Sequence, residues 1–112
     1  MKFNNGMIVN DEDALCCPNC GCDYVHHGRV EIFHRREDTE TGCHVTLDNT
    51  GVVIVNESQI DNPSPRRHGV KIFFWCEGCD RTSLLTIIQH TGCTYFDFRG
   101  VAKELVATDE SL

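Results

Sequence analysis

Cys17-Pro18-Asn19-Cys20-Gly21 and Cys76-Glu77-Gly78-Cys79-Asp80 decide the fold of this chain. Two cysteines separated by two residues can direct both sulfurs toward one cation, and four sulfurs complete the closed tetrahedral site of a structural zinc ion. Gly21 follows the first pair, at a place where a positive φ is often needed, and Asp80 takes the matching place after the second. The two pairs therefore predict one structural Zn²⁺ held by Cys17, Cys20, Cys76 and Cys79.

The length and composition of the chain suit one small globular domain. Its 112 residues are 40% hydrophobic, and a chain of this length builds only a limited core. Bound zinc would therefore supply much of the stability, and the metal-free form should fold poorly.

The charge balance and the absence of targeting signals narrow the function classes. Seventeen acidic residues against ten basic ones give a net charge of −7, which disfavours broad, non-specific attraction to nucleic acid. Residues 1–13 lack the apolar core of a signal peptide, and no apolar run is long enough to span a membrane. We therefore expect a cytoplasmic protein without a membrane partner, in which eight cysteines favour metal binding over disulfides.

The patterning between and after the cysteine pairs predicts a mainly β fold. Residues 70–75, 82–89 and 93–98 are rich in β-branched and aromatic side chains and predict a three-stranded antiparallel sheet. Residues 43–55 predict an inserted β-hairpin, which turns at Asn49-Thr50-Gly51 and packs against that sheet or extends it. Residues 24–36 predict extended structure with a bend at Gly28.

The predicted domain organisation places a single domain between two short terminal segments. Residues 1–15 are polar and acidic and predict a loose N-terminal arm, residues 16–107 form the single domain, and residues 108–112 form a flexible tail. Residues 101–107 could add one or two helical turns.

Other chemistries of the cysteines stay open at this point. Disulfides, a thioredoxin-like redox pair and an iron–sulfur site are alternatives to zinc. The first pair also has flanking cysteines, Cys16 and Cys22, which we interpret as buried small residues or spare thiols because only Cys17 and Cys20 have the two-residue gap with proline inside and glycine after.

The cysteine motif resembles the zinc-ribbon class over residues 17–21 and 70–98. More narrowly, residues 24–31, Phe74-Trp75-Cys76-Glu77-Gly78-Cys79 and Gln89-His90-Thr91-Gly92 look like small bacterial and bacteriophage zinc-ribbon proteins, over residues 17–98. That resemblance implies a bacterial or mobile-element origin and specifies no activity. Ribbons of this class serve in transcription, in RNA binding and in protein docking, so the fold alone does not select the function.

Histidines near the cysteines raise three further hypotheses. His26 and His27 resemble the histidine of His-Me finger nucleases, although the helix that carries further ligands in those enzymes has no counterpart here; the simpler interpretation is a hydrogen bond near the metal site. A second metal site that includes His90 and Cys93, or Cys43 and His44, is another alternative, and so is a cysteine–histidine nucleophilic pair.

Two basic clusters are candidates for nucleic-acid contact. Arg35 and Arg36 follow the first extended segment, and Arg66 and Arg67 lie in the proline-containing loop. They could contact a phosphate backbone, or they could pair with Glu37, Asp38 and Asp61. Acidic stretches such as residues 37–40 could also imitate the charge of DNA toward another protein.

The sequence as a whole predicts a non-enzymatic zinc-binding module that docks on a protein partner, for example as a phage or mobile-element protein that modulates a host complex or defence system. The first alternative is a nucleic-acid-binding zinc ribbon that uses Arg35, Arg36, Arg66 and Arg67. The second alternative is a metal-dependent nuclease that uses His26 and His27. The oligomeric state stays open.

Overall fold

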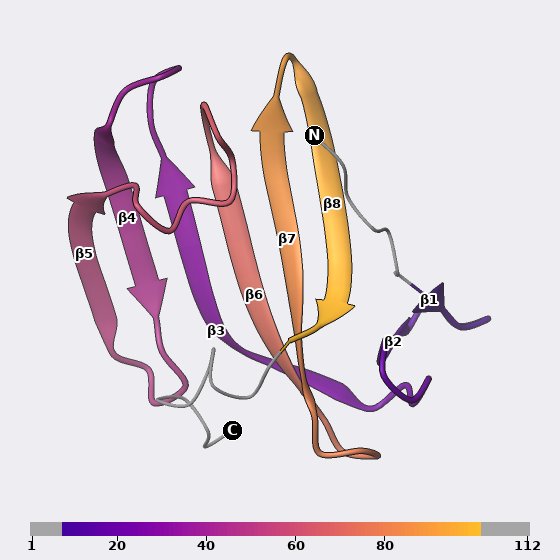
Figure 1. The fold of residues 1–112 in the computed structure, drawn as a ribbon. Coiled ribbons are helices and arrows are strands. Elements are labelled where there is room, and N and C mark those ends of the chain that lie inside the picture. Colours follow the sequence, from indigo (N-terminus) through magenta and orange to yellow (C-terminus); the bar gives the residue numbers. More distant parts are fainter. Residues whose placement is uncertain (1–7, 102–112) are drawn as a thin grey trace.

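A computed structural model describes residues 8–101, which form eight strands in two antiparallel sheets (Figure 1). The large sheet has six strands in the order β5-β4-β3-β6-β7-β8, and the small sheet pairs β1 with β2. The described residues contain no helix, and therefore none that could cross a membrane. The strands are β1 (Ile8–Val9), β2 (Leu15–Cys16), β3 (Val25–His34), β4 (Thr41–Leu47), β5 (Val53–Ser58), β6 (Gly69–Cys76), β7 (Thr82–His90) and β8 (Cys93–Gly100).

The predicted three-stranded antiparallel sheet is confirmed in β6, β7 and β8, which follow one another along the chain and pair in that order. The turn between β7 and β8 is the Thr91-Gly92 pair, and both residues have a positive φ, 48° and 83°. Two such residues produce a tight hairpin turn whose twist matches that of the strands.

The predicted hairpin is also confirmed, and it extends the sheet instead of packing on it. β4 pairs with β5, while β3 pairs with β4 on one side and with β6 on the other. The bend predicted at Gly28 lies in a shift of the β3–β6 register between His27 and Val30. Because β3 joins the hairpin to β6, the predicted small sheet with an insertion becomes one continuous six-stranded sheet.

The segment predicted as a loose N-terminal arm contains regular structure. Ile8 pairs with Cys16 and Val9 with Leu15. The turn between these strands is held by Asn10, whose side-chain oxygen accepts hydrogen bonds from the backbone N–H groups of Glu12 and Ala14. The remaining arm residues, most of the predicted helical turns and the predicted tail lie outside the described residues.

The two faces of the large sheet differ in chemistry. Directly paired residues lie on the same face, so the registers define two rows on one face that cross all six strands. Every residue in both rows is apolar. The first row is Val55, Val45, Ile32, Val70, Ile87 and Phe96, and the second is Val53, Leu47, Val30, Ile72, Leu85 and Phe98. We call these twelve residues the apolar face.

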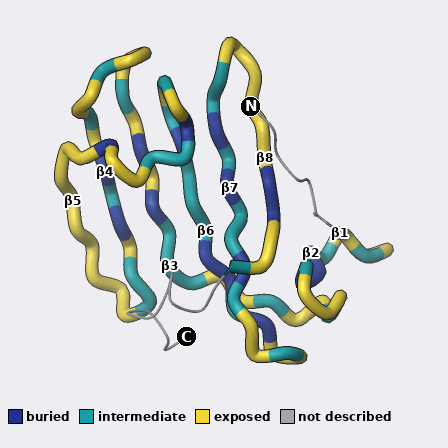
Figure 2. Tube along the Cα trace, in the orientation of Figure 1, coloured by how far each residue is buried: buried dark blue, intermediate teal, exposed yellow. Residues whose placement is uncertain are grey.

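The opposite face, which we call the polar face, carries polar side chains among apolar ones, and much of it is buried. Its rows include the buried residues Glu31, Phe33, His44, Thr46, Thr86, Ile88 and Asp97. The loop that joins β5 to β6 passes over part of the sheet (Figure 1), where Asn62 and Pro63 lie against Gly69. A Cβ atom at Gly69 would lie only 2.3 Å from the Asn62 side-chain oxygen, so this close approach needs glycine. Figure 2 shows buried segments on the central strands and a fully exposed β5.

Candidate metal centre

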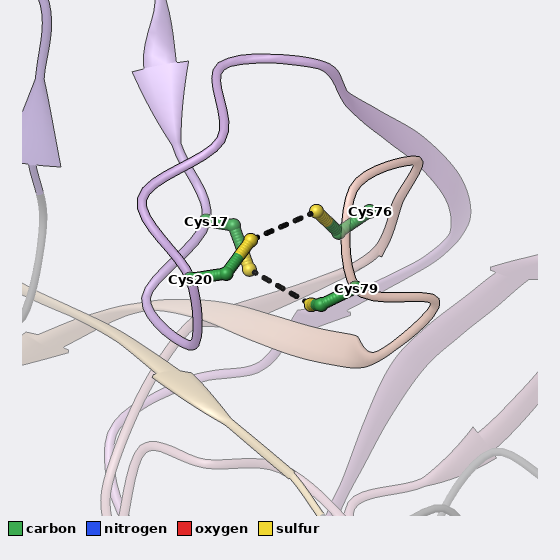
Figure 3. A group of neighbouring side chains, drawn as sticks. All are labelled: Cys17, Cys20, Cys76 and Cys79. Carbon is green, nitrogen blue, oxygen red and sulfur yellow. Dashed lines mark hydrogen bonds between the residues drawn. The ribbon is translucent and has the colours of Figure 1, made fainter.

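The four predicted cysteines lie together at one end of the large sheet. Cys17 follows β2 directly, and Cys76 is the last residue of β6, where it pairs with Val25 at the start of β3. The backbone N–H of Glu77 donates to the carbonyl oxygen of Tyr24, 3.0 Å away, which fixes the second cysteine loop against the chain that leaves the first. Figure 3 shows the four side chains converging from the two loops.

The sulfur positions fit a tetrahedral thiolate site. The Sγ atoms of Cys17 and Cys79 are 3.7 Å apart, those of Cys20 and Cys76 are 3.6 Å apart, and all four lie within 4.8 Å of one another. A tetrahedron with metal–sulfur bonds of about 2.3 Å has sulfur–sulfur edges of about 3.8 Å. One metal ion could therefore bind all four sulfurs with little movement of the chain.

The two cysteine loops repeat one backbone arrangement. The N–H groups of Asn19 and Gly78 each point at the sulfur of the cysteine two residues earlier, at 3.3 Å in both loops. The N–H groups of Gly21 and Asp80 donate to the carbonyl oxygens of Cys17 and Cys76. Gly21 and Asp80 have positive φ, 82° and 58°, as the sequence predicts. Such N–H···S contacts stabilise negative charge on the sulfurs.

The same contacts shift the pKa values of the thiols. Burial raises the pKa of Cys17, but the backbone N–H groups of Asn19 and Cys20, together with the thiols of Cys76 and Cys79, bring it down to about 7. Burial is the main cause that raises the pKa values of Cys76 and Cys79 above 9.0. For Cys20 the Cys22 N–H lowers the pKa, but burial and the neighbouring thiols of Cys79 and Cys17 leave it raised.

All eight cysteines are free thiols, and the remaining four lie outside the cluster. Cys16 is buried, as predicted for a small apolar residue, and its sulfur lies 3.7 Å from the carbonyl oxygen of Ala14. Cys22 is partly buried, and a Cβ atom at Gly78 would lie 3.1 Å from its sulfur. Cys43 and Cys93 are exposed.

The histidines do not form a second metal site with other described residues. Within residues 8–101, the four cysteines form the only group of three or more potential ligands close enough to share an ion. His26 contacts the carboxylate of Glu77, inside the second cysteine loop, and its ring lies 5.9 Å from that of Trp75. The ring of His27 meets the edge of Phe74, and that of His90 lies 6.5 Å from Tyr95. The contact of His26 matches the predicted hydrogen bond near the metal site.

The side chains of two of the four candidate arginines, Arg35 and Arg66, are bonded to other residues of the fold, and those of the other two are not bonded to any described residue. Arg35 donates to the carbonyl oxygens of Thr39, Ser64 and Arg67, at 2.9, 2.8 and 3.1 Å, and so ties the β3–β4 turn to the proline-containing loop. Arg66 binds the carboxylates of Glu37 and Asp38, at 2.8 and 2.9 Å, as the pairing alternative predicts. The side chains of Arg36 and Arg67 form no such bond with any other residue of the described range 8–101. Nucleic-acid contact stays a prediction.

Sequence reasoning missed one pair of residues that the fold brings together. The rings of His34 and His68 stack with their centroids 4.0 Å apart and their planes at 19°. His34 ends β3 and His68 precedes β6, so the antiparallel pairing of these two strands places them side by side. Only a prediction that β3 pairs with β6 would have found this contact.

Comparison of the chain with protein-family models, curated proteins and solved structures finds no match in any of the three.

Proposed function

We propose that this chain is a zinc-stabilised β-sheet module, without catalytic activity of its own, that docks on a protein partner through its apolar face. The observation that carries this proposal is the uninterrupted apolar character of the two rows across all six strands. A sheet with one hydrophobic face normally buries it against a second layer. Among residues 8–101 the only other regular structure is the two-stranded β1–β2 sheet, which is far too small to be that layer.

The apolar face is only partly covered, because Phe98 at its β8 edge is buried while several of its other residues are exposed. On the apolar face Val55 is 63% exposed, Val53 59% and Ile32 46%, whereas Glu31 on the polar face is only 3% exposed. Exposed apolar surface in one contiguous patch marks interaction sites in soluble proteins. The exposed rows therefore favour a surface that is covered in the working complex.

The chemistry of the apolar face restricts the partner. The rows span five strand spacings, or about 24 Å, and contain no charged or polar side chain, although the whole chain carries a net charge of −7. A matching partner brings an apolar surface whose centre is also free of charge, since a charged group there would lose its hydration without gaining a counterion. Nucleic acid, with its charged backbone, does not meet this requirement.

Zinc is the metal that fits the module best. Four cysteine sulfurs with no open coordination position are typical of structural zinc, which contributes folding free energy and does not bind substrate. The site thus supports the sheet from one end while the apolar face stays available. The resemblance to small bacterial and bacteriophage proteins supports a host complex or a defence system as the first partners to test.

Substitutions on one strand test the docking surface. Val53 and Val55 lie on the apolar face, whereas Ile54 between them points to the opposite face and is similarly exposed, at 52%. The double variant V53K/V55K should lose partner binding, while I54K should keep it. Affinity capture from the host, followed by binding measurements on the purified partner, would compare the three proteins. Circular dichroism would check that each variant remains folded.

Three outcomes are informative. A purified partner that binds wild type and I54K equally well but V53K/V55K at least tenfold more weakly supports the proposal. Equal binding to all three proteins contradicts it. A dimer of the chain that dissociates in V53K/V55K would show that a second copy occupies the apolar face, which also contradicts docking on a different protein.

A further inference from the structure

A pocket lies at the end of the sheet away from the metal centre. β3 ends at His34 and β6 begins at Gly69, whereas the cysteine cluster lies at the opposite ends of the same two strands. The end of β3, the start of β4 and the loop before β6 border an open pocket with a volume of about 490 Å³. That size falls within the roughly 300–1,000 Å³ of small-molecule sites.

The walls of this pocket are held in place by the Arg35 side chain and by a close approach of two strands. The three hydrogen bonds of Arg35 to carbonyl oxygens join both loops that flank the pocket. Gly42 also lines it, and a Cβ atom there would lie 2.3 Å from the carbonyl oxygen of His34. Because glycine permits this approach, the start of β4 packs directly on the end of β3. The pocket is therefore formed before any ligand arrives.

The lining is cationic in an otherwise acidic chain. Arg35, Arg36, Arg67, His34 and His68 line the pocket, and none of its lining residues is acidic. The nearby carboxylates of Glu37 and Asp38 are bound by Arg66 instead. Arg36 and Arg67 are exposed, and neither guanidinium forms an ion pair with another residue of the described part of the chain. Two arginines in this state can offer forked hydrogen bonds to an oxyanion.

The stacked imidazoles also favour an anion over a metal cation. The Nδ1 atom of His68 accepts a hydrogen bond from the Arg35 backbone N–H, at 3.2 Å. The proton of the neutral ring therefore lies on Nε2, which becomes a donor and not a metal ligand. Burial lowers the pKa of His68, and electrostatic interaction with the neighbouring His34 ring and the Arg67 guanidinium lowers it further. A bound anion would counter that effect.

From these contacts we propose that the pocket formed by His34, Arg36, Arg67 and His68 binds a phosphate dianion, either free or as a phosphomonoester. Arg36 and Arg67 supply the guanidinium groups, the two imidazoles supply N–H donors, and Arg35 holds both loops in position. The volume leaves room for the group to which the phosphate is attached. This site does not depend on the docking surface, and its ligand differs in chemistry from the apolar partner proposed for that surface.

Calorimetric titration of the metal-loaded full chain tests the site. The probes are inorganic phosphate, adenosine 5′-monophosphate, adenosine and a ten-residue oligothymidylate. R36Q and R67Q each remove one guanidinium from the pocket, and R81Q removes one exposed arginine that does not line it. We expect saturable binding of phosphate and the monophosphate, no binding of adenosine, and roughly tenfold or greater weakening in R36Q and in R67Q, because charge-assisted hydrogen bonds are the strong ones. R81Q should bind like wild type.

Imidazole NMR signals give a second readout that does not depend on the heat of binding. Addition of the monophosphate should shift the signals of His34 and His68 in wild type and in R81Q, and much less in R67Q. The proposal is overturned if phosphate and the monophosphate do not saturate the protein at millimolar concentrations, or if all variants bind them equally. Binding of the oligonucleotide without binding of phosphate would also overturn it, in favour of a nucleic-acid surface. Matching thermal melts would show that the variants are folded.

Discussion

The sulfur atoms of Cys20 and Cys76 lie 3.6 Å apart although these residues are 56 positions apart in the chain. The intervening segment consists largely of regular strands. It leaves the site along β3, forms the β4–β5 hairpin and returns along β6, which pairs with β3 and ends at Cys76. The β3–β6 ladder thereby aligns the two cysteine loops, so sheet formation and metal binding should stabilise each other.

Zinc binding should release between three and four protons per ion at pH 7. The pKa of Cys17 is about 7, so that thiol is roughly half ionised there, whereas Cys20, Cys76 and Cys79 have pKa values raised above 9.0 and remain protonated. All four must bind as thiolates, so affinity should fall steeply as the pH drops below 7. Calorimetry in buffers of different ionisation enthalpy counts the protons; a count below two would contradict four-thiolate coordination.

Position 80 should tolerate asparagine and reject β-branched residues. Asp80 has a φ of 58°, and its carboxylate accepts a hydrogen bond from the Trp75 indole N–H at 2.6 Å. Asparagine keeps the acceptor and tolerates this conformation, so D80N should change the free energy of unfolding little. D80V combines backbone strain of about 1–2 kcal/mol with loss of the hydrogen bond. Denaturant unfolding of the metal-loaded proteins would compare them, and equal stability of D80V and D80N would refute the assigned role.

Replacement of Arg35 should loosen two loops at once. R35K cannot reproduce the three bonds to the carbonyl oxygens of Thr39, Ser64 and Arg67, and it should lower the free energy of unfolding by about 1–3 kcal/mol. R36K is the matched control, because Arg36 is exposed and the change should stay within about 0.5 kcal/mol. Amide hydrogen exchange should show faster exchange in both loops of R35K alone. Unchanged amide exchange in both loops of R35K would contradict the proposed link between them through Arg35.

The polar face should depend on the pairing of Glu31. Its carboxylate lies 3.0 Å from His44 Nε2 and 3.2 Å from Arg29 Nη2 and is almost fully buried. E31A should therefore destabilise the fold by roughly 3–5 kcal/mol, because it removes the carboxylate that compensates the partly buried His44 and Arg29 side chains. E40A, at an exposed glutamate, is the control. Urea unfolding that shifts equally in both variants would contradict the importance of the pair.

Local patterns were sufficient to predict the four-cysteine cluster and much of the sheet. The spacing of each cysteine pair, the glycine after Cys20 and the aspartate after Cys79 specified both loops without reference to the rest of the chain. The two hairpins can also be predicted from local sequence, because Thr91-Gly92 and residues 49–51 are turn-forming residues between β-forming segments. These features depend on neighbours in sequence.

Features that depend on distant residues could not be predicted in this way. The central position of β3 requires pairing with β6, some forty residues later, for which turn chemistry gives no signal. The apolar face was hidden because segments such as Ile72-Phe73-Phe74-Trp75 are apolar at every position, so alternation does not show which side chains share a face. The Arg35 contacts and the His34–His68 stack arise only once both loops have met.

Metal analysis combined with chelation tests the central claim most directly. The protein purified without added metal should contain one zinc ion per chain by elemental mass spectrometry, and stripping it with a strong chelator should abolish cooperative thermal unfolding until zinc is restored. C20S should behave like the stripped protein, and C93S, which changes an exposed cysteine outside the cluster, should behave like the zinc form. A metal-free preparation that unfolds as cooperatively as the zinc-loaded one would contradict the account.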